Sequence, residues 1–250
     1  MPDAEALPEY EKSLRMVERA ELAAGFVRQV ELTAGPSLPR PLAECSVIDV
    51  GCGYGHGVAE LAGRCARVVG VEPNPVLVRA ARDRTADLDN VEIREGTVAD
   101  IADVEAFDLV ILDNVLEHID DQPEALRVIS RCLRPGGVAF ILVPNKAWPV
   151  EVHYHLPFLS WLPLPLATRY LRASGRGTDY TDASYAPSLG RLRTLFTAHP
   201  ELHATLTLPA DLSLAEGGGS PVYRYGVAAL RRFPQLWAIS KAFLLVVTKR

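Results

Sequence analysis

The sequence predicts an α/β fold, in which a largely parallel sheet carries helices on both faces. From Val47 onward, short apolar segments alternate with helical or loop segments, which is typical of parallel strands joined by crossover helices. Apolar runs such as "VAFILV" lack polar alternation and therefore indicate strands that are buried on both faces. A glycine-rich loop, "DVGCGYGHG", follows the first of these strands and precedes a helical segment.

Length and composition favour one domain and exclude several classes of protein. The 250 residues suffice for one large α/β domain, and a formal net charge of −5 argues against a general nucleic-acid binder. The acidic N-terminus lacks the pattern of a secretory signal, and no apolar run is long enough for a membrane span. The four cysteines have neither zinc-site nor paired spacing, so we expect a protein of the reducing cytoplasm.

The first part of the chain divides into a helical cap and a strand-rich core. Residues 10–33 have apolar side chains at helical spacing, and we assign residues 1–44 to an N-terminal cap. Residues 45–146 form the expected core. Its five strands are expected at Val47–Val50, Arg67–Val71, Val91–Arg94, Phe107–Leu112 and Val138–Val143.

The second part of the chain contains an insertion and two closing strands. Residues 147–200 begin with an apolar, aromatic and proline-rich stretch, which we interpret as a lid that binds the acceptor. Residues 201–250 contain two further strands, at Glu201–Leu208 and Lys241–Arg250, separated by a flexible "EGGGS" turn. We expect the second of these strands to close the sheet as an edge.

The glycine-rich loop predicts a nucleotide-type ligand, because glycine permits tight turns and close approach of a ligand to the backbone. A dinucleotide fingerprint, G-x-G-x-x-G, fails in both registers, since His56 and Val58 occupy the positions of its third glycine. Asp49 would also repel a pyrophosphate. The ammonium and sulfonium groups of S-adenosylmethionine, in contrast, suit a nearby carboxylate.

Five ordered segments resemble class I S-adenosylmethionine-dependent methyltransferases. They are "VIDVGCGYG", "VVGVEPNP", "VEIREGTVADI", "FDLVILDNVLEHIDD" and "LRPGGVAFILVPN". The resemblance implies a Rossmann-like sheet of seven strands with the last strand antiparallel. It also implies that the cofactor is S-adenosylmethionine, with S-adenosylhomocysteine as the product.

The resemblance further assigns residues to the cofactor site. Glu72 would accept the ribose hydroxyls, and Thr97 stands where many relatives have an aspartate beside the adenine, so Asp100 could supply that polarity. The implied cofactor-binding residues are Asp49, Gly51, Cys52, Gly53, Glu72, Pro73, Asn74, Thr97, Val98, Asp113, Asn114 and His118.

Histidines are the candidate catalytic residues, because methylation of a hydroxyl benefits from a general base. His153 is the preferred base and His118 the second candidate. On an extended segment His153 and His155 would share one face. No carboxylate spacing accompanies them, so no metal site is expected. The candidate acceptor-binding residues are Trp148, Tyr154, His155, Phe158 and Trp161.

These features predict transfer of a methyl group to a small or lipid-linked acceptor, at oxygen in preference to nitrogen or carbon. The apolar segment leaves peripheral contact with a membrane surface open, and the sequence assigns no oligomeric state. Methylation at nitrogen or carbon in a natural-product pathway is one alternative. An NAD(P)-dependent oxidoreductase and a non-catalytic interaction module that keeps the cofactor fold are alternatives of other classes. The polar stretch "TDYTDASY" (Thr178–Tyr185) is interpreted as a solvated connector.

Overall fold

A seven-stranded sheet forms the centre of the molecule, as the sequence predicts. The computed structural model describes residues 20–215 and 218–250. The strands are β1 (Ser46–Val50), β2 (Arg67–Glu72), β3 (Val91–Glu95), β4 (Phe107–Asp113), β5 (Leu133–Pro144), β6 (Leu202–Thr207) and β7 (Ala242–Lys249). Their order in the sheet is β3-β2-β1-β4-β5-β7-β6, and β7 alone runs antiparallel to its neighbours.

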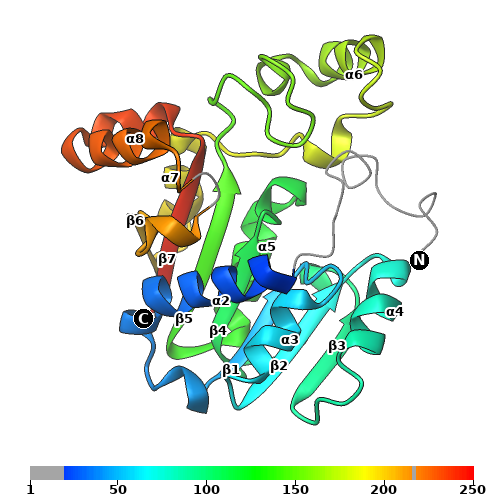
Figure 1. Cartoon of the computed structure of the whole chain (residues 1–250), viewed down its shortest axis with the longest axis vertical. Coiled ribbons are helices and arrows are strands. Elements are labelled where there is room, and N and C mark those ends of the chain that lie inside the picture. The colour runs from blue at the N-terminus through cyan, green and yellow to red at the C-terminus, as the bar shows by residue number, and fades with distance from the viewer. Residues whose placement is uncertain (1–19, 216–217) are drawn as a thin grey trace.

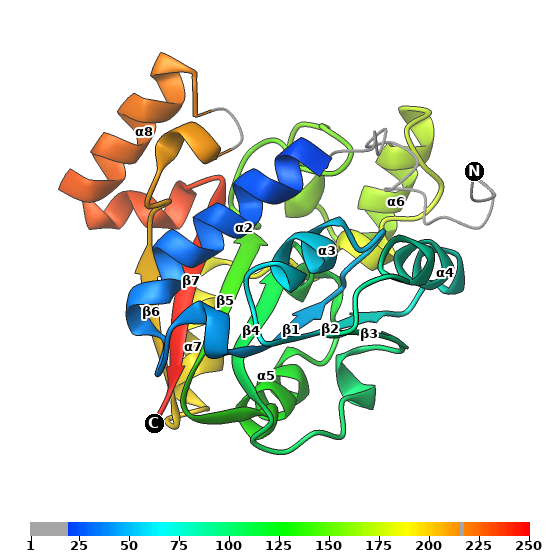
Figure 2. The same cartoon turned by 60° about the horizontal axis from the view of Figure 1, so that its bottom comes forward.

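Helices cover both faces of this sheet (Figures 1 and 2). On one face lie α2 (Ala20–Ala34), α3 (His56–Ala62) and α4 (Pro75–Arg84), and on the other lie α5 (Gln122–Cys132) and α7 (Leu189–Thr197). Alternate residues of each strand point to opposite faces, so that Val47 packs with α2 and α3 while Ile48 packs with α5. The sheet is therefore buried on both sides, which explains the continuous apolar runs.

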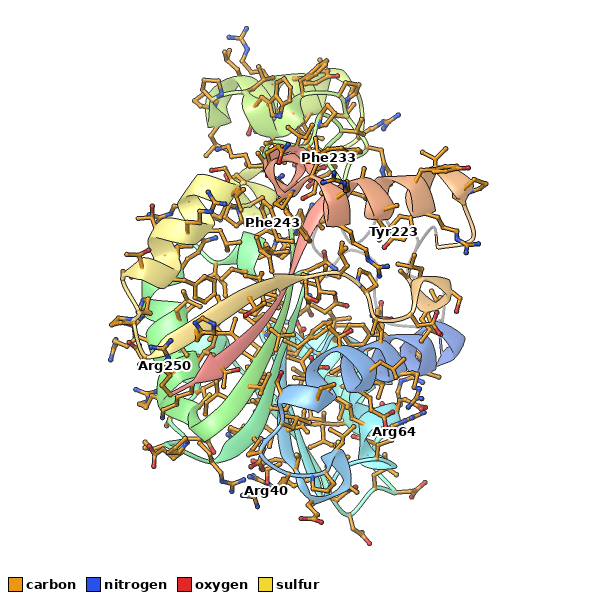
Figure 3. The ribbon with its side chains drawn as sticks, turned by 90° about the vertical axis from the view of Figure 1, so that its left-hand side faces the viewer. Arg40, Arg64, Tyr223, Phe233, Phe243 and Arg250 are labelled. Atoms are coloured by element: carbon orange, nitrogen blue, oxygen red, sulfur yellow. The ribbon has the colours of Figure 1, made fainter. Side chains whose placement is uncertain are left out.

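The expectation that the last strand forms an edge is wrong. β7 pairs with β5 on one side and with β6 on the other, so that β6 is the edge strand. Figure 3 looks at this side of the sheet, with Phe243 near the start of β7 and Arg250 beyond its end. The five central residues of β7, Phe243 to Val247, are buried. Buried and more exposed residues alternate along β6, as is expected of an edge strand with one exposed face.

The link between β6 and β7 is longer and more structured than a turn. It contains α8 (Pro221–Arg232) and a 3-10 helix (Pro234–Ile239), and α8 extends away from the sheet (Figures 1 and 3). Residues 10–19 of the expected N-terminal helix and residues 216–217 of the expected turn lie outside the described residues.

Residues 146–187 form a long segment between β5 and α7, which we call the insertion. Its two ends lie next to each other. The Lys146 backbone N–H donates to the carbonyl of Pro187 at 3.2 Å, which ties its two ends together. The insertion contains α6 (Leu164–Ala173) and lies above the carboxyl ends of the parallel strands (Figure 1). It has a small core of its own, made of Tyr154, Leu156, Leu159, Ala167, Leu171, Tyr180 and Ala183.

Two sequence assignments change at this insertion. α7 falls within the range 147–200 assigned to the lid, but it packs on the sheet through Leu189, Leu192 and Leu195. The Thr178–Tyr185 stretch is not a solvated connector, because Tyr180 and Ala183 are buried in the core of the insertion. Among the described helices, none combines the length and apolar character that crossing a membrane requires.

Candidate active site

The glycine-rich loop turns sharply at the carboxyl end of β1. Gly51, Gly53 and Gly55 all adopt positive φ angles, of 77°, 53° and 75°. A Cβ at Gly51 would lie 2.5 Å from Cγ2 of Val115, in the loop that follows β4, whereas a Cβ at Gly53 meets nothing within 4 Å. The loop is therefore packed against the protein at Gly51 and open at Gly53, where a ligand has access to the backbone.

Glu72, the last residue of β2, holds this loop in place. One carboxylate oxygen accepts the backbone N–H of Gly53 at 3.0 Å, and the other accepts that of Asn74 at 2.9 Å. Asn74 in turn caps α4 by accepting the N–H of Val76. A carboxylate has about four lone-pair sites, so Glu72 retains acceptor capacity for hydroxyl groups of a ligand.

Three carboxylates gather at the carboxyl ends of β1, β2 and β4. Asp49 is buried, and burial, followed by the charges of Asp113 and Glu72, raises its pKa to about 8. The pKa of Glu72 is also raised by burial, against the opposing effect of the two N–H groups that it accepts. Such a site stabilises a cationic ligand and repels a pyrophosphate, which is the physical distinction that the sequence suggested.

The other predicted cofactor residues line or support this edge in different ways. Thr97 is exposed, and both its backbone N–H and its hydroxyl donate to the Asp100 carboxylate at 2.8 Å. Val98 is buried in the main core, and Cys52 is buried beside Gly70. Besides Thr97, two of the predicted cofactor-binding residues have exposed side chains, namely Pro73 and Asn114.

Asn114 has a strained backbone at the end of β4. Its φ is 53°, which is uncommon outside glycine, and its side-chain amide donates to Asp113 at 2.9 Å. Strain of this kind concentrates where a loop is held in a specific geometry. The residues that follow contact the insertion: the Glu117 carbonyl accepts the backbone N–H of Tyr185 at 3.1 Å, and His118 Nδ1 lies 2.6 Å from the Asp182 carbonyl oxygen.

The structure brings two histidines and two glutamates together beside this bend. The imidazole rings of His118 and His153 lie 5.1 Å apart, centroid to centroid. His153 Nδ1 lies 2.7 Å from a carboxylate oxygen of Glu151, and its Nε2 lies 3.8 Å from a carboxylate oxygen of Glu117. Glu151 also accepts the backbone N–H groups of His153 and Tyr154, so the pair is rigid.

His118 is held as a neutral imidazole. Its Nδ1 lies 2.6 Å from the carbonyl oxygen of Asp182, and a carbonyl only accepts, so this nitrogen carries the proton. Burial, followed by the neighbouring His153, lowers the pKa of His118 to about 4. The Asp182 contact also shows why the Thr178–Tyr185 stretch is ordered, since it closes against the loop after β4.

Glu117 is the least satisfied group of the cluster. It is fully buried, and within the described part of the chain neither carboxylate oxygen has a hydrogen-bond partner. Burial, and then the charges of Asp113 and Glu151, raise its pKa well above the usual range. An orphaned buried carboxylate is costly and indicates a missing ligand, proton or ion.

The sequence missed the two glutamates of this cluster. The expectation that no carboxylate accompanies the histidines is wrong, because Glu151 lies two residues before His153 and Glu117 lies next to His118. The expectation that His153 and His155 share a face is also wrong. The chain turns between them, so that His153 is buried and His155 is exposed with a φ of 53°.

The predicted acceptor-binding aromatics do not gather in one place. Tyr154 belongs to the insertion's own core, and Trp148 is half-buried. Phe158 and Trp161 are each about half exposed, with ring centroids 4.8 Å apart. Leu164 and Leu166 are exposed on the same part of the insertion, which therefore presents an apolar surface.

Part of the chain is similar to known methyltransferases. Residues 48–141 match the family model described as "Methyltransferase domain". The ubiquinone biosynthesis O-methyltransferase of Methylobacterium sp. (strain 4-46) is 33% identical over 133 residues, which are 51% of this chain and 53% of that protein. The chain thus spans about half the length of the curated relatives that it matches.

Solved structures with the same fold cover nearly the whole chain. YcgJ from Bacillus subtilis has a TM-score of 0.57 at 20% identity and covers 89% of this chain and 98% of its own. A putative S-adenosylmethionine-dependent methyltransferase from Listeria monocytogenes has a TM-score of 0.58 at 14% identity, with coverage of 92% and 98%. The strand order and the matched segment thus make this chain similar to class I S-adenosylmethionine-dependent methyltransferases in its fold and in the domain of residues 48–141.

Proposed function

We propose that this protein is an S-adenosylmethionine-dependent methyltransferase and that it methylates the hydroxyl oxygen of a small acceptor with a sizeable apolar part. The observation that carries the proposal is the buried cluster of His118, His153, Glu117 and Glu151 beside the cofactor loop. Methylation of oxygen requires removal of a proton, and this cluster supplies groups that can take it. The names of the curated relatives, which are O-methyltransferases, support the same acceptor atom.

The reaction is an in-line displacement at the methyl group of S-adenosylmethionine. The acceptor oxygen attacks the methyl carbon, the sulfur–methyl bond breaks, and the sulfur retains the electron pair as S-adenosylhomocysteine forms. In the simplest version, His153 takes the hydroxyl proton, while Glu151 orients the ring and stabilises the imidazolium. Asp49 and Glu72 hold the cofactor, through its ammonium group and its ribose hydroxyls.

A phenolic hydroxyl suits this cluster better than an alkyl alcohol. A phenol has a pKa of about 10 and an ordinary imidazole one of about 6.5, whereas an aliphatic hydroxyl resembles water, near 15.7. Proton transfer to imidazole is therefore uphill by about 3.5 pKa units for the phenol and by about 9 for the alcohol. The smaller gap lets a histidine act as an effective base at neutral pH.

The insertion supports an acceptor with an apolar or lipid-linked tail. It lies above the carboxyl ends of the strands (Figure 1). It exposes the apolar side chains of Phe158, Trp161, Leu164 and Leu166. We propose that it closes over the acceptor and excludes water. The buried, unpaired thiols of all four cysteines fit a reducing, cytoplasmic setting.

A set of matched probes tests the acceptor atom. We expect 4-decylphenol to stimulate release of S-adenosylhomocysteine, and phenol without the tail to do so less efficiently. Decylbenzene, which lacks the hydroxyl, should give only the background rate. A rate with 4-decylaniline about tenfold or more above that with 4-decylphenol would favour a nitrogen acceptor instead.

Replacing Asp49 with asparagine should have opposite effects on the stability of the cofactor-free protein and on its affinity for the cofactor. The folded-state pKa of about 8 lies above the usual value of 3.8, so folding favours the protonated acid and stability is lost as pH rises from about 4 through 8. Asp49→Asn should therefore stabilise the cofactor-free protein at pH 8 by about 1–4 kcal/mol, and not at pH 4. Denaturant unfolding at the two pH values measures this.

The same substitution should weaken cofactor binding, because only an ionised Asp49 pairs with an ammonium group. In the wild-type protein, affinity for S-adenosylmethionine should rise between pH 6 and 8, and this rise should be absent in Asp49→Asn. Calorimetry in buffers of different ionisation enthalpy would detect the proton released on binding. Equal pH dependence in both proteins would mean that Asp49 does not pair with the cofactor.

A further inference from the structure

We infer that Glu117, His118 and His153 form a binding site for one divalent transition-metal cation. The ligand-type atoms of these three residues all lie within 4.8 Å of one another, and two of the residues, Glu117 and His153, are buried. Two imidazoles and one carboxylate are a donor set that zinc and related metals use in catalytic sites, where a fourth position stays open.

The orphaned carboxylate of Glu117 is an independent observation that points to a cation. The side chain is fully buried, and among the described residues no hydrogen bond satisfies either oxygen. In the part of the chain that the structure describes, its nearest cationic candidate is Nε2 of His153, at 3.8 Å, which is beyond hydrogen-bond distance. A bound cation would satisfy this carboxylate directly, whereas packing alone leaves it at a cost.

Both histidines are oriented as metal ligands usually are. In metal sites an imidazole generally donates its second N–H to a carboxylate or carbonyl oxygen, which fixes the ring and the tautomer. His118 Nδ1 has the carbonyl of Asp182 at 2.6 Å, and His153 Nδ1 has the Glu151 carboxylate at 2.7 Å. With the proton on Nδ1, a neutral ring carries its lone pair on Nε2, the nitrogen that a metal would use.

The geometry requires only a small contraction. Ligands about 2.1 Å from a tetrahedral cation are separated by about 3.4 Å, so the widest separation of 4.8 Å must shrink by little more than 1 Å. The two imidazole rings already approach each other edge to face.

The role of this cation rests on the proposed function. A cation acidifies a hydroxyl that it binds, so the acceptor's proton can leave to water and the oxygen can attack the methyl group. His153 then serves as a ligand and not as the proton acceptor. The metal site itself rests only on the geometry of the three side chains.

Titration with Co²⁺ tests the site without reference to activity. The protein is treated with EDTA, freed of chelator and titrated while visible absorption is recorded. We expect one equivalent to bind, and Glu117→Gln and His153→Ala to lower the affinity at least tenfold each. His199→Ala is the matched control, because it removes another histidine that lies beside a carboxylate, Glu201 at 3.3 Å. Wild-type affinity in His153→Ala would overturn the site.

A second measurement needs no variant and so does not depend on a variant's folding. The electron paramagnetic resonance spectrum of bound Cu²⁺ reports how many imidazole nitrogens coordinate it, and we expect two. A spectrum without coordinated imidazole nitrogen would overturn the assignment.

Parallel assays separate the metal site from the proposed function. Loss of methyl transfer after EDTA treatment, with recovery on adding Zn²⁺ or Co²⁺, supports both. Undiminished transfer by protein that binds no metal overturns the metal site and leaves His153 as a direct base. If the protein binds metal but methylates no hydroxyl, the proposed function is overturned and the assignment of the metal site stands. Metal binding with undiminished transfer by the stripped protein overturns the catalytic role of the cation.

Discussion

Replacing His153 with alanine is expected to lower turnover by about 10²–10⁴-fold while leaving the affinity for S-adenosylhomocysteine nearly unchanged. The imidazole is the centre of the buried cluster, in contact with Glu151 through Nδ1 and nearest to Glu117 through Nε2. It is needed whether it takes the proton itself or holds a cation that acidifies the hydroxyl. Single-turnover kinetics and calorimetry measure the two quantities separately.

Two further variants make this result interpretable. His199→Ala removes a histidine far along the chain from the cluster, and its turnover should match that of the wild-type protein. Glu151→Gln keeps the size of the side chain that positions His153 and should lower turnover less than His153→Ala does, with an unchanged KM for the cofactor. Normal turnover in a folded His153→Ala protein would leave alignment of the reactants as the only contribution of this region.

Replacing Gly53 with valine is expected to reduce cofactor affinity by about 100-fold or more, while the protein still folds. The position has a φ of 53° and open space around its missing side chain, so valine fills the place of the ligand and strains the backbone locally. Gly51 is less suited to this test, because a Cβ there would lie 2.5 Å from Val115 and disturb the packing.

Gly175→Val is the matched control for this substitution. Gly175 also has a positive φ, of 68°, and a Cβ added there would meet nothing within 4 Å, but it lies at the end of α6. Both variants should lose similar stability in denaturant unfolding, of about 1–3 kcal/mol. Equal losses of S-adenosylhomocysteine affinity in the two variants would mean that strain, and not occupation of the cofactor site, is responsible.

The sheet was predictable because its signals are local. Strands buried on both faces appear as apolar runs, and glycines mark the turn after β1, so the order of elements from Val47 to Pro144 follows from the sequence. The position of β7 within the sheet could not be predicted from the sequence, because strand order depends on pairing between segments that are far apart in the chain. A run of apolar residues such as "AFLLVV" suits a central strand, and this was the available signal that β7 is not an edge.

The glycine-rich loop after β1 was predictable for the same reason, but the histidine cluster was not. Glu117 and His153 are 36 positions apart, and only the return of the insertion over the loop after β4 brings them together. The Glu151–His153 pair is local, and its spacing in "VEVHYH" was a readable signal for an oriented imidazole. Tyr154 is buried in a core that forms within the insertion itself. Its position could not be predicted, because the proline-rich segment has no periodicity that reveals this core.

The position of the methyl group in the product tests oxygen methylation most directly. The protein would be incubated with S-adenosylmethionine labelled with carbon-13 in the methyl group and with 4-decylphenol, and the product examined by carbon-13 NMR. We expect a labelled methyl ether that accumulates in step with S-adenosylhomocysteine and is absent when decylbenzene is supplied. A label on a ring carbon of that phenol, or on the nitrogen of 4-decylaniline with none on oxygen, would contradict methylation at oxygen.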